Sequence, residues 1–455
     1  MRQSTRNLRL ICCLAAISAL TLACGLSRAE ETVAPQAPPS TPAAPTLAEN
    51  QPLPSDTPAA LAGADGQALP LRLLQFGFGQ KETTLGFGFL IENPNPDLLI
   101  WDTSYEVSIF DAAGTVIGST KGGVYTILPG QTLGVGGDLM LDEGLQAVSI
   151  GITLKDGQSE TSEYRQPFEA RNAWFREGEY SANVLSEVYN PYDVTYSSPI
   201  SFAILFDAEG NIIGGGQSYI NFLPTQDYGA TIIPVTYAGE VANVRVDAVV
   251  LDMKYSAEEV YLPAGATDIE LEDFGFGADN YSVGYGAVVR NPNSTVAVIN
   301  SVFTVIAYDA NNRVVDVNEG YLELIQPGES KGFGGGFYYA DPQEVDHATI
   351  FVHPGEYVEM EPIPWFGADQ ISYSEDGGLK SIFVTVSNPY DQDLEMVMVY
   401  AVLSNADGRI IGGGSNYIDT LPAGGSVEVE LYTYASGAPD DIRIYTDLLD
   451  YTVLQ

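Results

Sequence analysis

Apolar and polar residues alternate along much of the chain, and the clearest case is YSVGYGAVV, residues 281–289. A period of two places Tyr281, Val283, Tyr285, Ala287 and Val289 on one face of a β-strand. The apolar run VFTVIAYD follows, and ANNR separates it from VVDV as a tight turn would. No segment after the signal-like N-terminus has the period of an amphipathic helix. The pattern predicts short antiparallel strands joined by turns.

Three sequence landmarks recur four times in the same order. The first is an Asn-Pro pair after an apolar run, at Asn93, Asn190, Asn291 and Asn388, with spacings of 97, 101 and 97 residues. The second is a turn sequence, in FDAAGTVIG, FDAEGNIIG, YDANNRVVD and SNADGRIIG. The third is a proline, at Pro129, Pro224, Pro327 and Pro422. Such self-similarity predicts four homologous units.

The four units also form a second-order repeat. FGFG at Phe76 recurs at Phe274, and IIGGG at Ile212 recurs at Ile410, in both cases 198 residues later. NPN occurs in the first and third units and NPY in the second and fourth, again 198 residues apart. We therefore expect two similar pairs, with the pair as the functional module.

The length and the turn spacing together predict the architecture. We expect an all-β fold of four tandem immunoglobulin-like antiparallel β-sandwiches, arranged as two similar two-domain pairs and each with its own core. The expected boundaries are 71–165, 166–259, 260–361 and 362–455, which we call units 1 to 4.

The glycine-rich stretch LFDAEGNIIGGG, residues 205–216, reads as a hairpin and not as a phosphate-binding loop. Asp207 can bond the following backbone, and Gly210 can adopt the left-handed conformation that closes the turn. Asn312 is the most tolerant substitute for glycine at the corresponding place in unit 3. A phosphate loop would need Lys and Ser or Thr after its last glycine, and the chain has Gln217 and Ser218 there. Residues 214–216 then mark a bulge or close packing in the returning strand.

These landmarks also resemble a known family. A strand ending in V-x-N-P, a strand ending in F-x-L-Y-D-x-x-G and then L-x-P-G is similar to the FxLYD domain. FAILFDAEGNIIG matches best, followed by VSIFDAAGTVIG and FTVIAYDANN, whereas unit 4 departs with Ser404 and Asn405. The resemblance covers about half of each unit. It implies an extracytoplasmic sandwich related to the water-stress (WHy) and late-embryogenesis-abundant sandwiches, with no catalytic residues to carry over and, by analogy alone, a stress-protective role.

The N-terminus predicts export. Arg2, Arg6 and Arg9 precede an apolar run that is too short to span a bilayer, so residues 1–23 read as a signal peptide. The sequence LTLAC resembles a bacterial lipobox, which implies lipid attachment at Cys24 and membrane contact through that lipid only. A simply cleaved secreted protein and an uncleaved anchor stay open as alternatives. Residues 24–70 are rich in Pro and Ala and predict a disordered tether.

Charge and cysteine content narrow the function. The chain has 19 basic and 60 acidic residues, a net charge of −41, which disfavours nucleic-acid binding and docking on anionic lipid. A solvated acidic surface accounts for this, and bound calcium remains an alternative although no segment follows the calcium-loop pattern. Cysteines occur only at Cys12, Cys13 and Cys24, so the exported domains would have no disulfide and no thiolate metal site.

The sequence predicts no catalytic, metal or cofactor site. His347 and His353 lie six residues apart, about 20 Å along a strand, and could not share a metal. Tyr237, Tyr339 and Tyr434 each precede a polar loop, which suggests either interaction aromatics or rings buried as loop anchors.

We therefore expect a non-enzymatic cell-envelope lipoprotein that acts as an extracytoplasmic binding or spacer protein, with an envelope protein or polysaccharide as partner. One alternative is an adhesin or cell-wall polysaccharide-binding protein with exposed aromatics. A second is a glycosidase-like enzyme, which would require an acidic cleft between units.

Overall fold

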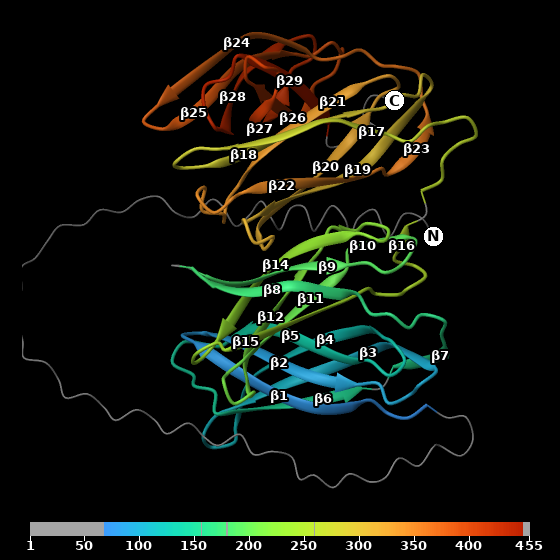
Figure 1. Ribbon diagram of the computed structural model, residues 1–455, viewed down its shortest axis with the longest axis vertical. Helices are drawn as coiled ribbons and strands as arrows, with labels where there is room; N and C mark the ends of the chain where they lie inside the picture. Colours follow the sequence, from blue (N-terminus) through green and yellow to red (C-terminus); the bar gives the residue numbers. More distant parts are fainter. Residues whose placement is uncertain (1–67, 156, 179–180, 259, 449–455) are drawn as a thin grey trace, which may run out of the picture. The chain divides into compact units, whose positions relative to one another are not determined.

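The computed structural model describes residues 68–155, 157–178, 181–258 and 260–448 (Figure 1). This part of the chain contains the antiparallel strands β1 to β29 and no helix, so the all-β prediction is confirmed for it. It therefore contains no helix long and apolar enough to cross a membrane. The signal peptide, Cys24 and nearly all of the predicted tether lie outside the described residues.

Units 1 and 3 each contain two separate sheets. In unit 1 the sheets are β1-β2-β5 and β4-β3-β6, with β7 also paired to β3. In unit 3 they are β17-β18-β21 and β20-β19-β22, with β23 also paired to β19. The strands of unit 1 are β1 (Arg72–Lys81), β2 (Thr84–Glu92), β3 (Leu98–Phe110), β4 (Val116–Ile127), β5 (Thr132–Met140), β6 (Ser149–Lys155) and β7 (Gln158–Thr161). Those of unit 3 are β17 (Glu270–Ala278), β18 (Val283–Arg290), β19 (Val296–Tyr308), β20 (Val314–Ile325), β21 (Ser330–Phe337), β22 (His347–His353) and β23 (Glu356–Glu359).

Units 2 and 4 each join the corresponding strands into one six-stranded sheet. The orders are β15-β11-β12-β14-β9-β8 and β24-β25-β28-β27-β26-β29, and unit 2 adds the small sheet β13-β10-β16. The strands of unit 2 are β8 (Glu169–Glu177), β9 (Ala182–Tyr189), β10 (Thr195–Ser197), β11 (Ile200–Phe206), β12 (Ile212–Tyr219), β13 (Phe222–Leu223), β14 (Tyr228–Tyr237), β15 (Asn243–Val249) and β16 (Ala257–Glu258). Those of unit 4 are β24 (Gly367–Asp376), β25 (Leu379–Ser387), β26 (Leu394–Ser404), β27 (Ile410–Leu421), β28 (Ser426–Ala435) and β29 (Asp441–Leu448). The alternation predicted from the sequence repeat thus appears in the sheet topology.

Several buried clusters are shared between units, whereas the sequence led us to expect one core for each unit. No described sheet contains strands of two units. However, the cluster around Phe87 and Phe89 of unit 1 includes Ile200, Phe202 and Val249 of unit 2. In the same way, the main cluster of unit 3 includes Tyr400 of unit 4. The two units of a pair therefore bury apolar surface against each other.

Each Asn-Pro asparagine is a buried tie between three segments. The Nδ2 of Asn388 donates hydrogen bonds to the carbonyl oxygens of Gln392, Leu421 and Pro422 at 2.8, 3.1 and 3.1 Å, and its Oδ1 accepts from the backbone N–H of Tyr390. Asn93, Asn190 and Asn291 make the corresponding bonds. All four side chains are buried, and no polar atom of the amide is left without a partner.

The residue after each Asn-Pro pair holds the incoming chain 26 positions earlier. In the NPN units, Asn95 exchanges two hydrogen bonds with the backbone of Leu69, and Asn293 does the same with Thr267. In the NPY units, the tyrosine hydroxyl donates instead, at 2.6 Å from Tyr192 to the carbonyl of Gln166 and at 2.7 Å from Tyr390 to that of Pro364. The two sequence variants therefore perform one structural task.

The predicted hairpins are confirmed. Asp207 Oδ1 accepts hydrogen bonds from the backbone N–H groups of Glu209 and Asn211. Gly210 has a φ of +83°, and Asn312, at the corresponding place in unit 3, has a φ of +58°. LFDAEGNIIGGG is therefore a hairpin segment, which contains the end of β11, a turn and the start of β12.

Glycines line the seam between the two units of each pair. In β2, Phe87 and Phe89 point into the core of unit 1, and alternation turns Gly86 and Gly88 towards unit 2. A Cβ added at Gly86 would lie 2.0 Å from the carbonyl oxygen of Thr236, and one at Gly215 would lie 2.3 Å from that of Phe87. Backbone therefore packs on backbone, and the glycines at 214–216 serve close packing.

The second pair repeats this seam. A Cβ at Gly284 would lie 2.0 Å from the carbonyl oxygen of Tyr434, and one at Gly413 would lie 2.4 Å from that of Tyr285. Figure 1 shows β18 and β21 of unit 3 beside β27 of unit 4, which follows from these contacts. The repeated FGFG and IIGGG sequences therefore belong to two copies of one interface.

We predict that Gly413→Ala destabilises the second pair by about 1–3 kcal/mol, because its methyl group would overlap the backbone of β18. The measurement is calorimetric thermal unfolding of the protein. Gly437→Ala is the matched control, since nothing lies within 4 Å of the added Cβ. Equal unfolding temperatures for the two variants would contradict the seam.

We also predict that Asn388→Asp destabilises unit 4 by about 3 kcal/mol or more, because a carboxylate would face three carbonyl oxygens without a donor. Asn311→Asp makes the same chemical change at an exposed position and should be nearly neutral. Urea unfolding of both variants tests this, and a small effect at Asn388 would refute the role of the tie.

Candidate functional site

A buried ionic cluster lies at the junction of units 3 and 4. Lys331 stands on β21, Glu329 lies just before it, and Asp447 stands on β29 of unit 4. The Lys331 ammonium lies 3.4 Å from Glu329 Oε1 and 3.4 Å from Asp447 Oδ1. All three side chains are 3–4% exposed. This is the most deeply buried set of mutually paired charges among the described residues.

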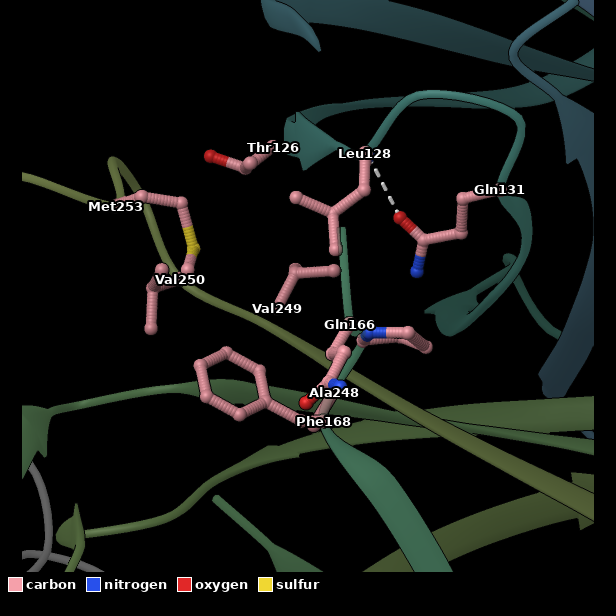
Figure 2. Close-up of a pocket in the computed structure, with 10 residues that line it drawn as sticks. Thr126, Leu128, Gln131, Gln166, Phe168, Ala248, Val249, Val250 and Met253 are labelled. Carbon is pink, nitrogen blue, oxygen red and sulfur yellow. Dashed lines mark hydrogen bonds between the residues drawn. The ribbon is translucent and has the colours of Figure 1, made fainter. Parts of the chain in front are cut away.

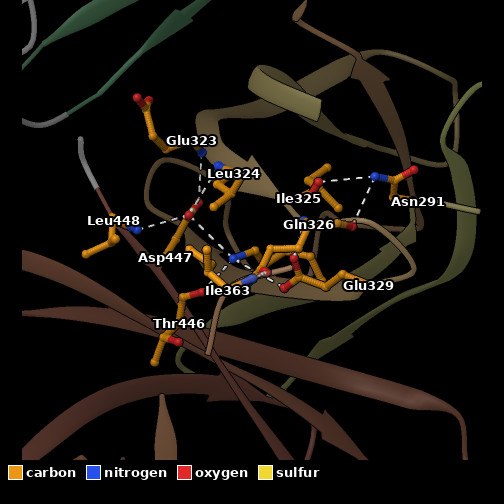
Figure 3. Close-up of polar contacts among 11 residues, drawn as sticks. Asn291, Glu323, Leu324, Ile325, Gln326, Glu329, Ile363, Thr446, Asp447 and Leu448 are labelled. Atoms are coloured by element: carbon orange, nitrogen blue, oxygen red, sulfur yellow. Dashed lines mark hydrogen bonds and ion pairs between the residues drawn. The ribbon is translucent and has the colours of Figure 1, made fainter. Parts of the chain in front are cut away.

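The backbone around the cluster satisfies its members unequally. Asp447 accepts hydrogen bonds from the N–H groups of Glu323, Leu324 and Leu448 (Figure 3). Lys331 donates to the carbonyl oxygen of Thr446 at 2.6 Å. Two of the three donors to Asp447 belong to β20, so this carboxylate of unit 4 bonds to the backbone of unit 3.

Glu329 has fewer partners. Its Oε2 accepts one backbone hydrogen bond, from Gln326 N–H at 2.6 Å, and its Oε1 faces Lys331. Burial raises the pKa of Glu329 to about 7, and the attraction of Lys331 only partly offsets this. Burial also raises the pKa of Asp447. The pKa of Lys331 is raised because its two carboxylate partners outweigh the effect of its burial.

A cavity of about 20 Å³ adjoins the cluster, lined by Lys331, Asp447 and Thr446 together with Gln326 and Trp365. A cavity of this size can hold one water molecule. It is far below the several hundred Å³ of a small-molecule pocket.

The first pair has the same site with a different lining (Figure 2). Its cavity measures about 10 Å³, and eight lining positions match those of the second pair at the 198-residue spacing. These positions are 126, 128, 166, 167, 168, 248, 249 and 250 in the first pair. Gln131 stands where unit 3 has Glu329, and its Oε1 accepts from Leu128 N–H at 2.8 Å. Leu133 and Val249 stand where the second pair has Lys331 and Asp447.

The chemistry available at this site is proton binding and docking of one unit on another. Among the described residues, no group of three or more His, Cys, Asp or Glu is placed to hold a metal ion. His347 Nδ1 lies 3.2 Å from Asp346, and His353 Nε2 lies 2.9 Å from Glu258. The two histidines thus have separate partners at opposite ends of β22.

The three tyrosines singled out from the sequence occupy different environments. Tyr237 is half-buried, stacks edge-on against Phe175 and donates to Glu177 Oε1 at 2.9 Å. Tyr434 is half-buried beside Tyr338, and burial raises its pKa to about 12. Tyr339 is 59% exposed. Tyr434 thus contacts Tyr338, the neighbour of Tyr339 in the sequence, whereas Tyr237 contacts Phe175.

The register explains why Tyr237 and Tyr434 differ. Gly214 pairs with Tyr237, whereas Gly412, 198 residues later, pairs with Ala435. Tyr434 is thus one position out of step with Tyr237, and a one-residue shift turns a side chain to the other face of a sheet. The 198-residue repeat shows the same offset, because Tyr434 corresponds to Thr236 and Tyr237 to Ala435.

Sequence reasoning missed the ionic cluster, although a signal for it exists. When the sequences of the two pairs are aligned with an offset of 198 residues, Leu133 corresponds to Lys331 and Val249 corresponds to Asp447. Two apolar positions that become opposite charges together indicate an ion pair. Cys24, the predicted lipid site, lies outside the described residues.

Comparison with known proteins gives little. No protein-family model and no curated protein matches the chain. Among solved structures, native Escherichia coli alpha-2-macroglobulin is 10% identical with a TM-score of 0.13, covering 83% of this chain and 27% of that chain. The same protein activated by porcine elastase is 10% identical with a TM-score of 0.11, covering 84% and 44%. The chain spans less than half the length of either, and similarity this weak carries no argument about fold or function.

We predict that Lys331→Met destabilises the second pair by about 3–5 kcal/mol, because two buried carboxylates would lose their cation. Lys121→Met is the control, since the Lys121–Glu106 pair is largely exposed. Calorimetric unfolding at neutral pH measures both, and an unchanged transition in Lys331→Met would contradict the assigned ion pairs.

Proposed function

We propose that the chain is a non-enzymatic, extracytoplasmic lipoprotein of the cell envelope, in which four immunoglobulin-like, FxLYD-type sandwiches act as a spacer or binding protein. Its working part would be the two-unit pair. The lipid on Cys24 and the tether 24–70 would place the pairs away from the membrane.

The glycine seam is the observation that carries this proposal. Where backbone packs on backbone at the seam glycines, no side chain separates the two units, and this restricts their movement relative to each other. The shared clusters around Phe87 and Phe333 add apolar burial across the same junctions. A pair built in this way supports a rigid element that presents or spaces other surfaces.

The cavities support a role without catalysis. The cavities at the two pair junctions measure about 10 and 20 Å³. A glycosidase would need a cleft for a sugar ring between two carboxylates. Neither of these two cavities is of that size, so they give the enzyme alternative no support.

A second candidate function is polysaccharide binding. Tyr281, Tyr338 and Tyr339 of unit 3 are 79%, 71% and 59% exposed, and Tyr338 contacts Tyr434 edge-on. The corresponding residues of unit 1 are Thr83, Met140 and Leu141, so only the second pair has these rings. Exposed tyrosines of this kind favour sugar or protein contacts. Loss of glycan retention in Tyr281→Ala/Tyr338→Ala, with unchanged unfolding, would support this candidate.

We predict that Cys24→Ser moves the protein from the membrane fraction to the soluble fraction and abolishes incorporation of a labelled fatty acid, because the lipid would be its only membrane contact. Cys13→Ser, inside the predicted signal peptide, should leave both unchanged. Fractionation of cells that express each variant measures this, and membrane retention of unlipidated Cys24→Ser would refute the proposed anchoring.

A further inference from the structure

The buried cluster of the second pair has an unbalanced charge. Two carboxyl groups, Glu329 and Asp447, share the single ammonium of Lys331. If both acids were ionised, one negative charge would stay unpaired in a site that is almost fully removed from water. Burial of such a charge costs several kcal/mol, so a carboxyl group in this position tends to bind a proton.

The geometry identifies the group that takes the proton. Asp447 is held as an anion by three backbone N–H donors and by Lys331. Glu329 lies at the same 3.4 Å from this ammonium but receives only one N–H donor. The carboxylate with fewer donors is the easier one to neutralise.

Other groups around the cluster do not supply a balancing cation. Tyr400 faces it from β26, Tyr445 lies over Gly332 beside it, and Tyr390 lines the adjoining cavity, whereas Glu323 of β20 contributes its backbone N–H. The tyrosines are neutral in the physiological range, because burial raises the pKa of Tyr390, Tyr400 and Tyr445. The proton on Glu329 therefore removes the extra negative charge, and the ammonium of Lys331 then balances the carboxylate of Asp447.

We propose that Glu329, Lys331 and Asp447 form an acid-tightened latch that docks unit 4 on unit 3, strongest in mildly acidic surroundings and weaker as the pH rises. The first pair lacks the latch, because Gln131, Leu133 and Val249 occupy the same positions without charge. The two pairs therefore differ in their response to pH although they share one seam.

The direction follows from linkage. The pKa of Glu329 rises from 4.5 to about 7 in the folded protein, so the folded state binds more protons than the unfolded state between these values. The stabilisation that Glu329 contributes is then fully present below about pH 4.5. It is lost as the pH rises from there through about 7. The raised pKa of Asp447 acts in the same direction, whereas Lys331 loses its proton only in alkali.

The test compares the exported chain with Glu329→Gln from about pH 5 to about pH 8 at constant salt. In the parent, the unfolding equilibrium constant of the second pair should rise by up to tenfold per pH unit between about pH 5 and about pH 7 and change little above that. Glu329→Gln keeps the Lys331–Asp447 pair and cannot ionise, so its transition should vary less with pH and exceed that of the parent at the alkaline end. Calorimetry and the infrared band of a protonated carboxyl group, which should be lost in the variant, report this.

A triple variant, Glu329→Gln/Lys331→Leu/Asp447→Val, transfers the lining of the first pair into the second. This lining already packs at the equivalent junction, so the variant should fold and its second-pair transition should lose the same pH dependence. Parallel pH dependence in the parent and both variants, or an unchanged carboxyl band in Glu329→Gln, would overturn the proposal.

Discussion

Contact between bare backbones is the constraint on which each pair depends. Facing β-sheets ordinarily pack about 10 Å apart because side chains fill the space between them. At the seams, carbonyl groups of one unit lie where a Cβ of the other would be, as at Gly86 against Thr236 and Gly284 against Tyr434. Every second residue of the seam strands must therefore be small, while the residues between them fill the core. The Phe-Gly alternation of FGFG satisfies both demands at once.

A glycine face buries little apolar area, so it cannot hold two units together alone. The surrounding clusters supply the rest: Phe202 and Val249 enter the core of unit 1, and Tyr400 enters that of unit 3. The buried asparagines act at a different level, because each joins a strand end to two loops of its own unit. Ties such as Asn93 fix the loops, and the seam and its flanking clusters fix the neighbouring unit.

The sequence predicted what depends on local rules. The left-handed residues Gly210 and Asn312 were expected from turn chemistry, and the four-fold repeat was visible in the Asn-Pro pairs. The sequence also indicated a bulge or close packing at residues 214–216. It did not identify Phe87 as the partner, because the partners of a strand across an interface leave no periodic signal in that strand. The offset between Tyr237 and Tyr434 was visible in the sequence, because they lie 197 and not 198 residues apart, but the face that each ring takes depends on strand pairing.

The ionic cluster adds a selectivity that the glycine seam lacks. The seam is nearly identical in the two pairs, so by itself it would allow unit 1 to dock on unit 4. In that arrangement Asp447 would face Leu133 and bury a carboxylate without its cation. The opposite exchange would place Lys331 against Val249, so that Lys331 would lose Asp447 and keep only Glu329 as its partner. An uncompensated buried charge costs more free energy than a buried ion pair contributes. The cluster therefore destabilises docking on the wrong unit more than it stabilises docking on the right one. Charged residues in the second pair and apolar residues in the first therefore let duplicated units keep one interface and still choose their own partners.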